Sequence, residues 1–389
     1  MNVFFQNRNI AAFYLAIMCI QYMPFEGYGV STIKVAAMAF AGIFTFWKAP
    51  YISKATIWSL LFIGTVLFSA IIWNNNYRSS TLIYLSLFLL MFNMYYGLVY
   101  QGAFSIDFFI RLIKGLIFAY VGVLLLQQMA ILIGIRNLPA INLVYFLNRG
   151  LGANSLSLEP SHSARIMAVA FYAFLKVCEI KQGNPLSLKQ LFFENRWLTF
   201  GFLYAMVTMG SGTAFVALGI LSLYFVRPNY AFFVVVMAIL FYMVIPQINY
   251  EPLNRASKAI ELTLEGDEKE MQRADGSAAS RINPILNTWK YIDLSSGETW
   301  FGKGSDTGNR LKLQSKKRMI GNINDYGLLS YIIGIFLILS CCITRFISIG
   351  TLLIFVLVGF VVNNIAYIWG IYMLLVPVKY FYKNYTLHE

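Results

Sequence analysis

Apolar runs of about 20 residues recur along nearly the whole sequence. A helix needs about that length to cross a bilayer, and lipid offers no hydrogen-bond partners to the backbone, so each run must be helical. Hydrophobic residues make up 59% of the 389 residues and charged residues 12%, which is more apolar surface than a soluble core of this length would bury. The sequence therefore predicts an all-α, polytopic membrane bundle.

We expect twelve spanning helices, which divide the chain into three parts. Residues 1–248 form a transmembrane bundle with an outer loop at 134–162, residues 249–325 form one large extracytoplasmic loop, and residues 326–389 hold the C-terminal spans and tail. The runs beside Gly210-Ser211-Gly212 also fit a broken or re-entrant segment, and the last two spans fit one helix kinked at Asn363-Asn364. The expected spans are 9–23, 30–47, 55–73, 80–100, 112–133, 163–180, 197–209, 214–226, 231–248, 326–343, 347–362 and 365–378.

Lysine and arginine predict the orientation of these spans. With a cytoplasmic N-terminus, thirteen basic residues fall in the inner loops and five in the short outer segments, as the positive-inside rule requires. We therefore expect both termini in the cytoplasm and a first span that acts as an uncleaved start-transfer helix. The net charge of +13 is then a topology signal with added attraction to anionic lipids, and we expect no nucleic-acid binding. The inner residues are Arg8, Lys48, Lys54, Arg111, Lys114, Lys176, Lys181, Lys189, Arg196, Arg227, Arg345, Lys379 and Lys383, and the outer ones are Lys34, Arg78, Arg136, Arg149 and Arg165.

Cysteine and histidine are too sparse for a disulfide framework or a zinc site. The four cysteines fall within or at the ends of spans, and the second of the two histidines, His388, lies in the tail. No His or Cys grouping has the spacing of metal ligands. We expect neither a metal nor a cofactor.

One polar cluster, LSLEPSHSAR at residues 156–165, lies on the predicted outer side. Pro160 suits the first turn of a helix, so it predicts the start of the sixth span. Free N–H groups and the positive end of the helix dipole make such a start an anion site, and His162 and Arg165 share one helix face. The same field would keep Glu159 ionised. The alternative is a capped helix whose arginine reaches the lipid head groups.

A second cluster lies in the large outer loop, where Arg281 precedes an apolar stretch and Asp306 and Arg310 follow a glycine turn. This pattern suits a segment along the membrane surface, with Trp289 and Trp300 at interface depth and Arg281 directed at a lipid phosphate. The planar guanidinium can bond two phosphate oxygens at once. The alternative is that these arginines touch only bulk phospholipid.

Several of these stretches together resemble O-antigen and capsular polysaccharide polymerases of the Wzy type, in the superfamily that also contains the O-antigen ligases. The stretches are SLEPSHSAR, the SGT turn at residues 211–213, SRINPILNTWKYI followed by FGKGSDTGNR, and NDYGLLSYIIG. The resemblance implies a GT-C-like fold and a metal-independent glycosyltransferase of the bacterial inner membrane. Such an enzyme polymerises oligosaccharide repeat units carried on undecaprenyl diphosphate at the periplasmic face, with a chain-length regulator and a flippase as further partners.

In the family, arginines of the two large outer loops are tied to activity, which maps onto Arg149 or Arg165 and onto Arg281. Arg310, Asp306 and Ser211 are further candidates for substrate or diphosphate binding. The metal-dependent relatives use an acidic pair in the first outer loop, whereas MPFEGYGV here offers only Glu26. The resemblance therefore implies no divalent metal.

The chemistry of the reaction agrees with this assignment. When a sugar is transferred from a diphosphate carrier, the diphosphate leaves as a stable anion. The catalyst therefore needs fixed positive charge beside the diphosphate more than it needs a proton donor. The acceptor hydroxyl loses a proton, for which Glu159 and His162 are the candidate bases, with Asp306 behind them. Glu159 is preferred for its position, although such a transfer can proceed without a strong base and Glu159 can instead orient an arginine.

Two other functions stay in view. The ligase branch has a histidine in its large outer loop, and residues 249–325 contain none, which favours a polymerase. A transporter predicts ionisable residues at mid-membrane depth and often an internal repeat. The spans here carry almost none away from their ends, and the two halves do not resemble each other.

Overall fold

The computed structural model of the chain is mostly α-helical in the residues that it describes. It describes residues 6–22, 31–48, 52–73, 78–144, 150–226, 276–304 and 318–386, together with residues 254, 258, 261 and 262. Eleven of the twelve expected spans coincide with helices, and the remaining one, 231–248, lies outside the described residues. The elements are α1 (Asn7–Cys19), α2 (Thr32–Lys48), α3 (Lys54–Ile72), α4 (Ser79–Tyr100), α5 (Ile106–Leu132), β1 (Asn137–Leu138), η2 (Pro139–Ile141), β2 (Leu143–Val144), α6 (Pro160–Gln182), α7 (Leu188–Glu194), α8 (Arg196–Thr208), α9 (Gly212–Ser222), η3 (Leu223–Phe225), α13 (Gly276–Tyr291), α14 (Gly297–Phe301), η7 (Ile320–Asn322), α16 (Ile323–Cys342), α17 (Ile349–Val358) and α18 (Ala366–Thr386).

Length and composition of the helices indicate a membrane protein. Within the described part of the chain, α3, α4, α5 and the segment Ile320–Cys342 are long and apolar enough to cross a bilayer, and the apolar helices Thr32–Thr45, Gly212–Phe225 and Ile349–Val358 are shorter. Large apolar side chains such as Phe40, Leu60 and Ile71 are exposed on the outer faces. Water would penalise so much exposed apolar surface, whereas lipid would not.

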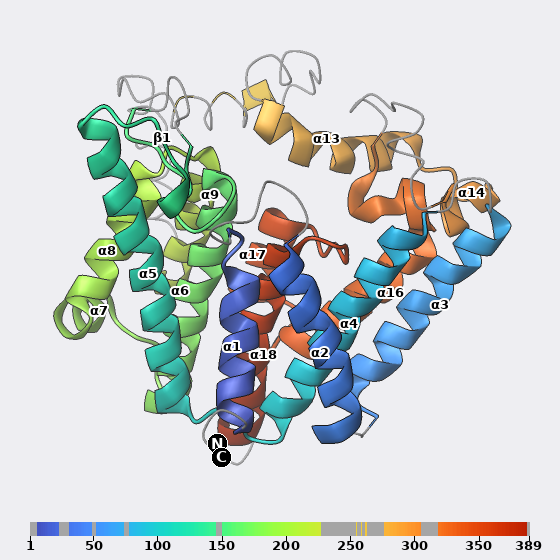
Figure 1. Ribbon diagram of the computed structural model, residues 1–389, viewed down its shortest axis with the longest axis horizontal. Coiled ribbons are helices and arrows are strands. Elements are labelled where there is room, and N and C mark those ends of the chain that lie inside the picture. The colour runs from blue at the N-terminus through green and yellow to red at the C-terminus, as the bar shows by residue number, and fades with distance from the viewer. Residues whose placement is uncertain are drawn as a thin grey trace.

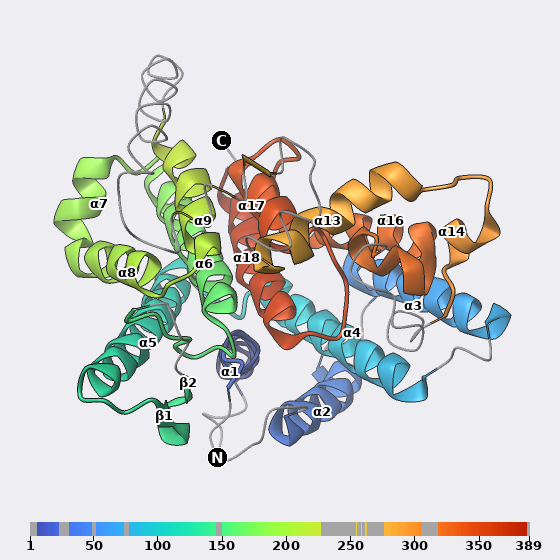
Figure 2. The same cartoon turned by 90° about the horizontal axis from the view of Figure 1, so that it is seen from above.

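The helix α18 lies at the centre of the bundle. It packs against α1, α4, α6 and α16. Seen from above, α5 to α9 lie on one side and α2, α3, α4 and α16 on the other, with α1, α17 and α18 between them (Figure 2). The start of α1 and the end of α18 lie at the same end of the bundle (Figure 1).

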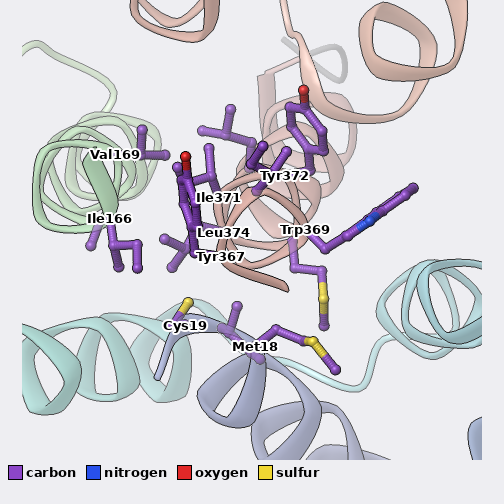
Figure 3. Close-up of a cluster of buried hydrophobic side chains, with 14 of the residues drawn as sticks. Met18, Cys19, Ile166, Val169, Tyr367, Trp369, Ile371, Tyr372 and Leu374 are labelled. Carbon is purple, nitrogen blue, oxygen red and sulfur yellow. The ribbon is translucent and has the colours of Figure 1, made fainter. Parts of the chain in front are cut away.

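Close packing fixes α18 against its neighbours. Figure 3 shows Met18 and Cys19 of α1 and Ile166 of α6 surrounding the buried side chains of α18. At Gly370 a Cβ atom would lie 2.9 Å from backbone atoms of Met18 and Cys19, so α1 and α18 touch backbone to backbone. A larger residue at Gly370 would push the two helices apart.

The helices α17 and α18 are separate, which removes the alternative of one kinked helix. Gly359 ends α17 in the left-handed conformation (φ 69°), and its N–H bonds to the carbonyls of Ile354 and Phe355. A glycine in this conformation is a common helix C-cap. The shorter break between α8 and α9 falls at residues 209–211.

The segment that carries α13 and α14 lies across the end of the bundle opposite to the start of α1 (Figure 1). α13 runs across the top of the spanning helices, and Trp289 on it is 91% exposed, as expected for a helix at the membrane surface. The chain after α14 docks closely on the start of α16. Gly302 and Gly327 both have positive φ, and a Cβ on Gly327 would lie 2.1 Å from the carbonyl oxygen of Trp300.

Candidate functional site

A cavity of about 500 Å³ lies at this same end of the bundle. Its walls come from the N-terminal turn of α6, the end of α17 with the start of α18, the segment around η7, and α13. One part of the lining is polar and another is apolar, which suits a ligand with a charged head and an apolar chain. The polar lining is Glu159, Ser161, His162, Arg165, Arg318, Asn322 and Asn363, and the main apolar lining is Pro284, Ile285, Phe355, Val356, Leu357, Val358, Ile365 and Ile368.

The start of α6 forms the polar wall. Pro160 occupies the first helical position, as the sequence predicts, and Glu159 precedes it with extended backbone. The N–H groups of His162 and Ser163 both donate to the carbonyl oxygen of Glu159, at 3.1 and 3.3 Å. The positive end of the helix dipole therefore lies beside the cavity, where it favours a bound anion.

Buried hydrogen bonds hold the loop ahead of α6 in place. Ser155, with φ 51°, exchanges two bonds with the side-chain amide of Gln127, at 2.7 and 3.1 Å. Ser163 Oγ donates to the carbonyl oxygen of Asn154 at 2.6 Å, which ties the first turn of α6 to the loop. Buried hydrogen bonds of this kind keep the N-terminal turn in one position.

Arg165 is a buried cation that lines the cavity. The residue is only 9% exposed, and its Nη1 donates to the hydroxyl of Tyr367 on α18 at 2.5 Å. Its Nε has no hydrogen-bond partner, and among the described residues no carboxylate pairs with it. Burying a charge without a counter-ion is costly, so a site that keeps one is suited to an anionic ligand.

Tyr367 also holds the imidazole of His162. The two rings stack with centroids 4.2 Å apart and planes 21° apart, while Arg165 Cζ lies 5.7 Å from the centroid of the Tyr367 ring. His162 Nε2 lies 3.8 Å from Glu159 Oε2, and Ser161 Oγ donates to the same carboxylate oxygen at 3.3 Å. The predicted residues Glu159, His162 and Arg165 therefore meet in one site.

The facing wall brings in Arg318, which sequence analysis did not select. This arginine is exposed and lines the cavity just before η7. α13 holds the segment in place, because Asn287 Nδ2 donates to the carbonyl oxygen of Arg318 at 3.3 Å and Thr288 Oγ1 accepts from Ile320 N at 2.8 Å. The only signal in the sequence is that Arg318 ends the basic run KKR, with five residues between it and the NDYG stretch.

The structure describes only some of the other site residues predicted from the sequence. Arg281 lies on α13 one turn before Pro284 and Ile285, which line the cavity, but its side chain lies outside the description. Ser211 is buried at the N-cap of α9 and is not part of the cavity lining. Arg149, Asp306 and Arg310 lie outside the described residues.

Sequence analysis also did not select Tyr367 or Gln21, the two partners that orient Arg165 and His162. Tyr367 lies 202 residues from Arg165 and Gln21 lies 141 residues from His162. Tyr367 follows the Asn363-Asn364 break, which was the only hint of a site there. In the part of the chain that the structure describes, no three His, Cys, Asp or Glu residues group as metal ligands.

Comparisons with protein-family models, with curated proteins and with solved structures find no match to this chain. The resemblance to the Wzy type therefore stays a prediction from motifs.

Proposed function

We propose that this protein is a membrane glycosyltransferase that polymerises lipid-diphosphate-linked oligosaccharide repeat units. The observation that carries the proposal is the buried Arg165, which lines a partly apolar cavity at the N-terminus of α6 without a described carboxylate partner. A polyprenyl diphosphate has the matching chemistry, with a charged head for the polar wall and an isoprenoid chain for the apolar residues of α17. The motif resemblance supports the same substrate class.

In the proposed reaction, a hydroxyl of one lipid-linked unit attacks the anomeric carbon of another, and the diphosphate departs with the bonding electrons. Arg165, the dipole of α6 and Arg318 on the facing wall stabilise the negative charge that builds on the diphosphate. Arg281, one turn along α13 from Ile285, is a further candidate for this role. Arg165 and the first turn of α6 are already held in place by buried contacts, so little reorganisation at this wall opposes the reaction.

The finer topology belongs to the same proposal. Twelve spans in a GT-C-like arrangement would place the cavity at the periplasmic face of a bacterial inner membrane and both termini in the cytoplasm. The excess of basic residues in the inner loops supports this orientation. Reporter fusions test it, because alkaline phosphatase at either terminus should be inactive and green fluorescent protein there should fluoresce. Active alkaline phosphatase at a terminus would contradict the orientation.

The function is tested by the length of the surface polysaccharide in cells that lack the protein. Wild-type protein should restore long chains, whereas Arg165→Met should leave chains of one repeat unit at normal protein level. Arg345→Ala is the matched control, because Arg345 bonds Tyr382 near the end of α18, away from the cavity lining. If full-length lipid-linked chains accumulate without reaching their acceptor, the protein is a ligase instead. Unchanged chain lengths in Arg165→Met would contradict the proposed site.

A further inference from the structure

His162 is held by a residue from the beginning of the chain. Its Nδ1 lies 2.9 Å from Oε1 of Gln21, which follows α1. Gln21 is itself fixed to the loop ahead of α6, because its N–H donates to the carbonyl oxygen of Leu156 at 3.1 Å. On its other side, Nζ of Lys34 on α2 donates to the carbonyl oxygen of Gln21 at 3.0 Å.

The backbone of Leu158 decides which end of the Gln21 amide faces His162. The N–H of Leu158 lies 3.2 Å from the same amide atom that contacts His162. A backbone N–H can only donate, so this atom must be the carbonyl oxygen and not the NH₂ group of the amide. An oxygen at that position can only accept, and His162 Nδ1 must therefore carry a proton.

The position of this proton determines what the other ring nitrogen can do. A neutral imidazole carries one proton, so protonated Nδ1 leaves the lone pair on Nε2. Nε2 is on the Glu159 side of the ring, 3.8 Å from Oε2, and both residues line the cavity with Arg165. That separation is longer than a hydrogen bond, yet it is short enough for the carboxylate to stabilise a charged imidazole.

We propose that Gln21 is a positioning residue that keeps neutral His162 protonated on Nδ1, so that Nε2 serves as the general base for the acceptor hydroxyl. The role as base rests on the proposed glycosyl transfer, whereas the position of the proton does not. It also reverses the preference between the two candidate bases, because Glu159 then stabilises the charged imidazole instead of taking the proton itself.

The proton and the electrons balance in this step. The hydroxyl proton moves to Nε2 as the acceptor oxygen bonds the anomeric carbon, and the broken C–O bond leaves its electron pair on the diphosphate. The Nδ1–H of the imidazolium then donates to Gln21, and its Nε2–H faces the carboxylate of Glu159. The proton on Nε2 finally passes to water. Among the described residues, Arg165 and Arg318 line the same cavity and Lys34 bonds Gln21, so these positive groups oppose the charge on the ring, whereas Glu159 is a negative group beside it.

The tautomer can be measured directly, because the sequence holds only two histidines. In protein with His388→Asn and ¹⁵N-labelled histidine, every histidine signal belongs to His162. Above the pH at which the ring titrates, we expect a protonated Nδ1 and an unprotonated Nε2, distinguished by their couplings to the ring protons. Gln21→Met keeps the side-chain length without the acceptor, and its signals should shift toward the Nε2-protonated form. A wild-type ring protonated on Nε2, or no shift in Gln21→Met, would overturn the proposal.

Activity separates the base role from the tautomer. Gln21→Met should lower kcat about 10- to 100-fold with little change in KM, within the contribution of one general base. Gln21→Glu retains an acceptor for Nδ1 and adds a negative charge, so it should keep most activity and move the acid limb of the pH–rate profile to higher pH. If the Gln21→Met variant folds normally and its kcat is unchanged, the base role is refuted. If even the wild-type protein fails to polymerise, the proposed function fails while the spectroscopic result still decides the tautomer.

Discussion

Replacing Arg165 by methionine should remove activity without removing stability. The guanidinium is 9% exposed, bonds only the hydroxyl of Tyr367 among the described residues, and leaves its Nε unpartnered. Losing the charge-assisted bond to Tyr367 costs about 1.5–3 kcal/mol, while removing a buried charge without a counter-ion gains a few kcal/mol and offsets that cost. Methionine keeps most of the apolar contacts of the side chain. The unfolding temperature should therefore stay the same or rise.

The loss of activity follows from the bonds that Arg165 would make to a diphosphate. Each charge-assisted hydrogen bond contributes about 1.5–3 kcal/mol, and one such bond made in the transition state corresponds to roughly a 10- to 150-fold fall in kcat/KM. Two bonds would give about the square of that factor. Thermal unfolding of purified protein in detergent and conversion of a lipid-linked repeat unit measure the two effects. A lower unfolding temperature with unchanged conversion would show that Arg165 is structural and refute the reasoning.

Three further predictions test the walls of the cavity and the packing around it. Arg318→Ala should lower kcat/KM about 10-fold or more at normal unfolding temperature, because this arginine is exposed and contributes little to the core. Gly327→Ala should lower the unfolding temperature and the amount of protein in membranes, since its Cβ would lie 2.1 Å from the Trp300 carbonyl oxygen, whereas Gly122→Ala, with nothing within 4 Å, should be neutral or stabilising. Tyr372→Phe should cost about 1–3 kcal/mol of unfolding free energy, measured by denaturant titration, because the hydroxyl satisfies a backbone carbonyl between α17 and α18.

The helices are predictable from the sequence because their signals are local. The length of each apolar run and the glycine, proline and asparagine residues between runs place eleven expected spans on helices. The ends are less predictable. α5 begins at Ile106 and not at 112, because Ser105 caps it by accepting from Phe108 N, and its first turns carry charged residues that an apolar window excludes. The short helix α7 and the β1–β2 hairpin are too brief to give a periodic signal.

The site is predictable only where its residues are neighbours in the chain. Glu159, His162 and Arg165 follow one another around Pro160, so the helical repeat already places them together. Gln21 and Tyr367 come from distant segments, and nothing in their local sequence marks them. Such pairs are set by the packing of α1 and α6 against α18, which no local pattern encodes.

The backbone between α17 and α18 shows why the cavity lies where it does. Non-helical backbone inside a membrane bundle is tolerated only where protein or a cavity satisfies its polar groups. Here Tyr331 donates to the carbonyl of Gly359 at 2.9 Å, Tyr372 to that of Val361 at 2.8 Å, and Trp369 to that of Asn363 at 2.7 Å. Three aromatic side chains thus donate hydrogen bonds to the carbonyls of this irregular stretch. A continuous helix would satisfy these carbonyls within its own backbone and would not need such donors. Because this stretch leaves room opposite the positive end of α6, the broken helix pair and the anion-binding helix start form one site, and straightening the pair would remove the cavity.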